Sequence, residues 1–128
     1  MQIVSALFAD DIELRQAAGN AARIDLTGIQ FSAAAPGPFP VTITPHLVII
    51  VRCGPDEAGT GALEVVFMRD GEQVARNVQP LQVEPGKFAY RLVRGELEFP
   101  APGTIEAHCR IDMDDATVVP YTLLPPVT

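Results

Sequence analysis

The chain has 128 residues, a length typical of one domain with a single hydrophobic core. Its formal net charge is −7 and its nine Lys and Arg residues form no cluster, which argues against nucleic acid and anionic membranes as partners. Hydrophobic residues make up 48% of the chain, too many for a disordered protein. We therefore expect one folded domain spanning residues 1–128.

The N-terminal segment predicts a cytoplasmic protein. Residues 1–8 are apolar but have no basic start, and Asp10 and Asp11 interrupt the run, so we expect no signal peptide. The longest unbroken apolar run, residues 47–51, is far too short to span a membrane. In the cytoplasm, cysteines are expected to stay reduced.

Two early segments predict strands. Residues 1–9 and residues 23–31 both alternate between apolar and other side chains, which is the period of a half-buried strand. Residues 35–40 contain three prolines, which cannot donate to a sheet ladder, so this segment predicts a stiff surface connection.

Residues 10–20, between the first two strands, are ambiguous. Asp10 or Asp11 could cap a short helix that ends at Gly19 and Asn20. The same residues could equally form a long loop joining two strands. We keep both alternatives, so the chain is expected to contain at most one short helix, near its N-terminus.

Residues 47–53 are nearly all apolar and predict a central strand. Arg52 suggests that the side chains sharing its face, Val48 and Ile50, point outward. The other face is then assigned to the core, with the residues Leu47, Ile49, Val51 and Cys53.

The second half of the chain predicts further short strands separated by turns. Asp70-Gly71 is a strong hairpin signal, and alternation continues through residues 73–83 and 88–99. Residues 103–112 alternate cleanly, with the inward face formed by Ile105, Ala107, Cys109 and Ile111. Strand count and spacing predict an all-β, two-sheet antiparallel immunoglobulin-like sandwich of about eight strands.

The two cysteines, Cys53 and Cys109, fall on the inferred core faces of two strands. Their separation resembles that of the inter-sheet pair of immunoglobulin domains, but the chain has no Trp and Ala107 stands where that pattern expects Tyr. We interpret them as buried, reduced thiols, with a redox pair as the alternative.

Candidate metal ligands are few. Glu106 and His108 share one strand face, and the acidic turn Asp112, Asp114 and Asp115 offers oxygen ligands suited to calcium. The alternatives are a solvated strand face for the first pair and, for the acidic turn, aspartates bonded to their own backbone. We expect no metal and no cofactor.

No catalytic motif is present in the sequence. It has only Ser5 and Ser32 as serines, no nucleophile elbow and no phosphate-binding loop. We name no catalytic residue, and the sequence favours a non-enzymatic role.

Several short motifs together resemble a family of short bacterial proteins of unknown function with an immunoglobulin-like β fold. They are Leu7-x-Ala9-Asp10, Leu26-Thr27-Gly28-Ile29, Phe39-Pro40, Asp70-Gly71 and Leu97-x-Phe99-Pro100-x-Pro102-Gly103. The resemblance implies the fold but no catalytic residues.

The leading functional hypothesis is a protein-interaction or structural module, an accessory or assembly subunit of a larger complex or particle. The partner would be another protein or a second copy, and the candidate interaction residues are Val48, Ile50 and Phe39. The alternative is a small-ligand binder or cryptic enzyme, with a pocket near His46, His108 and the acidic turn.

Overall fold

The computed structural model describes residues 1–127 and contains strands and one short 3-10 turn but no α-helix in that range. The longer strands are β1 (Gln2–Gln16), β2 (Ala22–Gln30), β5 (His46–Arg52), β6 (Thr60–Arg69), β7 (Glu72–Gln82), β8 (Phe88–Arg94), β10 (Gly103–Ile111) and β11 (Thr117–Leu124). Three strands have only three residues each: β3 (Ser32–Ala34), β4 (Val41–Ile43) and β9 (Leu97–Phe99). The prediction of an all-β chain is confirmed.

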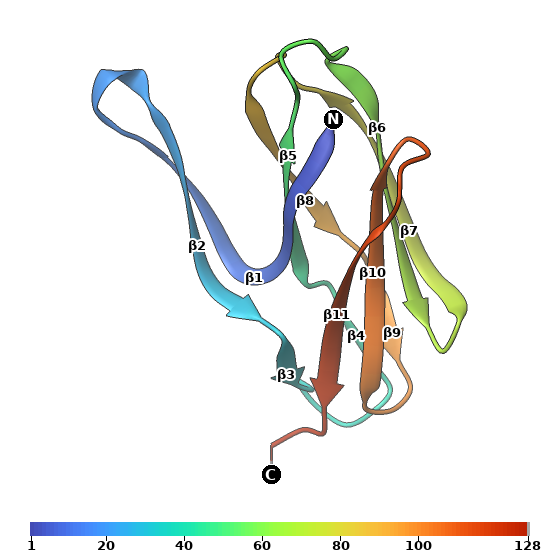
Figure 1. The fold of residues 1–128 in the computed structure, drawn as a ribbon. Helices are drawn as coiled ribbons and strands as arrows, with labels where there is room; N and C mark the ends of the chain where they lie inside the picture. The colour runs from blue at the N-terminus through green and yellow to red at the C-terminus, as the bar shows by residue number, and fades with distance from the viewer. Residues whose placement is uncertain (128) are drawn as a thin grey trace.

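The strands form two large sheets and one small one (Figure 1). The first sheet has the order β2-β1-β5-β8, and the second has the order β3-β11-β10-β6-β7. The small sheet pairs β4 with β9. All pairs are antiparallel except β3 and β11, which run parallel and so depart from the all-antiparallel prediction.

The core lies between the inner faces of the two large sheets, as alternation predicts for half-buried strands. The predicted inward residues of β5 and β10 are confirmed, since all of them are at most 3% exposed. The small sheet adds Leu97 and Phe99, both fully buried. Among the described residues no polar or charged residue is buried, so the core is entirely apolar.

Val48 points away from the core, as predicted, but it is buried there and not exposed for contact with a partner. Val48 is 1% exposed, although it lies on the outer face of its sheet and outside the core cluster. In the register it is directly flanked by Leu7 of β1 and Leu92 of β8, whose longer side chains cover a valine between them. Ile50, flanked by Ser5 and Tyr90, is half-buried.

Residues 10–20, for which the sequence allows a helix or a loop, form mostly strand. β1 continues to Gln16, and only Ala18–Asn20 form a 3-10 turn. Figure 1 shows the resulting β1–β2 hairpin projecting away from the two packed sheets. We call residues 10–28 the arm: residues 10–16 of β1, the turn, and residues 22–28 of β2.

None of the described residues forms a helix with the length and apolarity needed to cross a bilayer.

Replacing Val48 by Thr should destabilise the protein by roughly 1–3 kcal/mol, because a hydroxyl is then buried among apolar side chains. Val118, which is 44% exposed on the other large sheet, provides the matched control, and its Thr variant should lie within about 0.5 kcal/mol of wild type. Urea unfolding measures both changes. Equal stability of the two variants would contradict the burial of Val48.

Candidate functional site

The arm is a two-stranded ribbon in which the partners of β1 change. Up to Ala9, β1 pairs with β5, and from Phe8 onward it pairs with β2. Beyond this overlap, within residues 1–127, β2 is hydrogen-bonded to β1 alone. Both long edges of the arm therefore carry backbone groups without a neighbouring strand.

One face of the arm is apolar. The register places Ile12 opposite Leu26 and Leu14 opposite Ile24, so the four side chains share a face. By strand alternation they lie on the same side of β1 as Phe8, which is buried in the core and only 1% exposed. The opposing sheet does not extend this far: none of the four belongs to the core or packs against it. Leu14 is 56% exposed, and Ile12, Ile24 and Leu26 are half-buried.

The opposite face of the arm is charged. Glu13 lies opposite Asp25, and Arg15 lies opposite Arg23, so both direct pairs bring like charges together. A diagonal ion pair offsets this in part, because the Arg15 guanidinium donates from Nε and Nη2 to both oxygens of Asp25. Glu13 and Arg23 have no ion-pair partner within the described part of the chain.

The base of the arm is held by a short polar chain. Gln30 donates from Nε2 to the Asp10 carboxylate, and Tyr121 donates from its hydroxyl to Oε1 of Gln30 at 3.2 Å. Burial, with a smaller contribution from Asp10, raises the pKa of Tyr121. Gly28 has φ +65°, and a Cβ there would lie 2.2 Å from Oδ2 of Asp10, so this position needs glycine.

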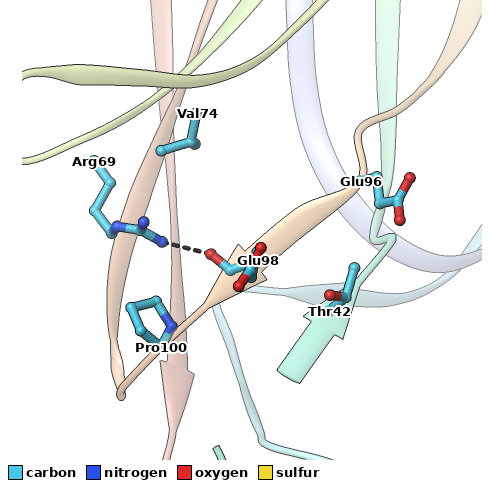
Figure 2. A pocket seen from close by; sticks show the side chains of 6 residues that line it. All are labelled: Thr42, Arg69, Val74, Glu96, Glu98 and Pro100. Atoms are coloured by element: carbon cyan, nitrogen blue, oxygen red, sulfur yellow. Dashed lines mark hydrogen bonds between the residues drawn. The ribbon is translucent and has the colours of Figure 1, made fainter. Parts of the chain in front are cut away.

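A hollow of about 430 Å³ lies where β9 meets the β6–β7 hairpin. Figure 2 shows Arg69 reaching from β6 toward β9 and Glu96 lying apart from its guanidinium. Nη1 of Arg69 donates to the Glu98 carbonyl at 2.6 Å, and the guanidinium lies 5.9 Å from the Phe99 ring centre. These contacts bind β9 to β6. Arg69 thus has a structural role at this hollow.

The residues of the alternative pocket are not brought together. His46 lines a hollow beside Asp10 and Tyr121, whereas His108 lines another beside Glu64 and Arg110 on the outer face of the second large sheet. The acidic turn borders a third hollow. No single described hollow joins them.

The candidate metal ligands are also separate. Nε2 of His108 is 3.4 Å from Oε1 of Glu106, a set of only two donors. In the acidic turn, Oδ1 of Asp112 accepts from the Ala62 amide at 2.9 Å, which ties the turn to β6. Within residues 1–127, no three His, Cys, Asp or Glu side chains gather as a metal site.

Both thiols are free and fully buried in the core, so the burial predicted for Cys53 and Cys109 is confirmed. Burial raises the pKa of Cys109 to about 12. Sγ of Cys53 faces the carbonyls of the following turn, at 3.6 Å from Gly54. The raised pKa of Cys109 works against the thiolate form that a cysteine nucleophile needs.

The third predicted interaction residue, Phe39, is half-buried and packs against the core. The sequence interpretation missed the arm, although its signal was present: Ile12 and Leu14 alternate before the turn, as Ile24 and Leu26 do after it.

No family model matches the chain, and no curated protein matches it in sequence.

Thiol labelling tests the two buried cysteines. At neutral pH a thiol reagent should modify native protein slowly, because both sulfurs are inaccessible and the Cys109 pKa leaves almost no thiolate. Both should react rapidly in denaturant. Fast labelling of native protein would contradict the burial.

Acid should weaken a carboxylate network on the second large sheet. Hydrogen bonds from Arg76 and then Arg110 lower the pKa of Glu64 below its ordinary value of 4.5. Its stabilising contribution is therefore present above that value and lost as the pH falls through the lower, folded-state pKa. The melting temperature of wild type should fall more steeply below about pH 4.5 than that of Glu64→Gln. Parallel curves would show that Glu64 contributes no pH dependence.

Proposed function

We propose that this protein is a non-enzymatic interaction module with an immunoglobulin-like sandwich body, and that its arm is the docking element. As an accessory or assembly subunit, it would present the arm to another protein chain. The observation that carries the proposal is the apolar row of Ile12, Leu14, Ile24 and Leu26, which continues the core face beyond the opposing sheet.

The physical argument concerns what an isolated arm lacks. A two-stranded hairpin is marginally stable in water unless a third strand or a packed layer joins it. The arm has neither: no packed layer of the core covers its apolar face, on which Leu14 is 56% exposed and the other three side chains are half-buried, and both edges are open. A partner that covers the face gains up to roughly 1.5–3 kcal/mol for each large apolar side chain fully buried.

Edge pairing offers a second source of affinity at the same element. Unpaired strand edges accept an added strand through backbone hydrogen bonds, while side-chain pockets select the sequence. The arm combines such edges with an apolar face, which suits a protein partner better than a small molecule. The chemistry found elsewhere supports no competing enzymatic site.

The arm variant Leu14→Thr/Ile24→Thr tests the proposal. Thr has the β-branched shape favoured in strands, but the double change removes two of the four large apolar side chains of the face. Association with a partner or a second copy should weaken at least tenfold, about 1.4 kcal/mol. Quantitative co-purification from the native cell and sedimentation of the purified protein measure the two forms of association.

The control is Val78→Thr/Val118→Thr, which alters two exposed side chains on the other large sheet, 48% and 44% exposed. This control should retain every association, and both variants should melt within a few degrees of wild type. If the arm variant keeps the partners and oligomeric state of wild type, the arm is not the docking element.

A further inference from the structure

The open edge of the arm has a sequence that is complementary to itself. We propose that two copies of the chain pair their arms side by side through β2, antiparallel about a two-fold axis at Ile24. The product is a four-stranded sheet of order β1-β2-β2-β1. This inference rests on the proposed function of the arm and names its partner as a second copy.

Of the four strands that end the large sheets, β2 is the one whose outer edge is long and unprotected in residues 1–127; the outer edge of β1 is open as well, but only over residues 10–16. On β8, the Tyr90 carbonyl accepts from Nη1 of Arg91 at 2.7 Å, and the Leu92 carbonyl accepts from Nε2 of Gln79 at 3.2 Å. On β7, Pro80 removes one ladder donor, a common device for blocking an edge. β3 is only three residues long. β2 carries none of these protections.

Charge complementarity selects the partner and the register. In antiparallel pairing about Ile24, Arg23 of each copy lies opposite Asp25 of the other, so two opposite-charge pairs form. Pairing about Arg23 or Asp25 would instead place like charges against each other. A two-fold axis between residues would put the apolar face of one strand beside the charged face of the other.

The same register also places each like-charge pair of one arm beside a pair of opposite charge in the other arm. Arg15 and Arg23 of one copy then stand in one row with Asp25 and Glu13 of the second copy. Each like-charge pair thus meets a pair of opposite sign. On the other face, Ile24 meets Ile24 of the second copy, flanked by Leu14 on both sides, and the apolar strip is doubled.

A charge-exchange experiment tests the pairing. In the variant Arg23→Asp, residues 23 and 25 are both acidic. In the variant Arg15→Asp/Asp25→Arg, residues 23 and 25 are both basic, and the diagonal ion pair between positions 15 and 25 is kept with its charges exchanged. Each variant also turns the like-charge pair at its altered positions into an opposite pair within the arm, so the hairpin is retained. Alone, each should be monomeric at the concentration where wild type is half dimeric. Mixed in equal amounts, they should form a heterodimer by sedimentation.

A cysteine at the axis gives an independent measurement. Directly opposite residues have Cα atoms about 4.5–5.5 Å apart, within disulfide range, so oxidised Ile24→Cys should yield a cross-linked dimer. The control Leu14→Cys is exposed on the same face, but its two copies would lie three strand spacings apart, about 14 Å, and should not cross-link.

Two results would overturn the pairing: a wild type that remains monomeric to about 1 mM, or charge variants that fail to associate when mixed although wild type dimerises. In the first case, the arm is still supported as a docking element if wild type co-purifies with another protein and Leu14→Thr/Ile24→Thr does not. If that variant also retains every partner, the proposed function falls with the pairing.

Discussion

The change of partners in β1 is the constraint on which the rest of the structure depends. Its first half completes a large sheet beside β5, and its second half leaves that sheet to pair with β2 alone. The change occurs where Gly28 makes room for the Asp10 carboxylate and Gln30 links that carboxylate to Tyr121. One strand is therefore part of the core at its start and an exposed ribbon at its end.

That division explains why apolar residues of β1 extend beyond the core. After the polar Asp10, apolar residues resume on the face of Phe8 at Ile12 and Leu14, but these two side chains lie outside the core. Leaving such side chains in water forgoes the free energy that burial would supply. The Arg15–Asp25 ion pair is exposed and contributes little by itself. The arm is thus held mainly by its backbone ladder and by its base, and it gains most from a covering partner.

Alternation in the sequence was sufficient to identify the faces that build the core, because each strand there has one covered side. It failed for Val48, whose burial depends on Leu7 and Leu92 from strands distant in sequence. It also failed for the arm: residues 10–20 fit a capped helix or a loop, and the turn has Gly19-Asn20 and not the Asn-Gly order usual in hairpins. Strands of three residues, such as β4 and β9, are too short to show a period.

The acidity of the chain bears directly on where two copies can meet. Two copies of a chain of net charge −7 repel each other, so contact between their surfaces would be opposed at low salt. Ile24 lies four residues from Gly28 along β2, about 13 Å, so pairing at Ile24 would hold the two arm bases about 26 Å apart. That distance exceeds the Debye length of about 8 Å at physiological ionic strength, and the repulsion between bodies is largely screened. The Arg23–Asp25 pairs act at contact distance and keep most of their attraction. An arm that carries its own counter-charges at its tip is thus a means by which an acidic domain can associate with itself.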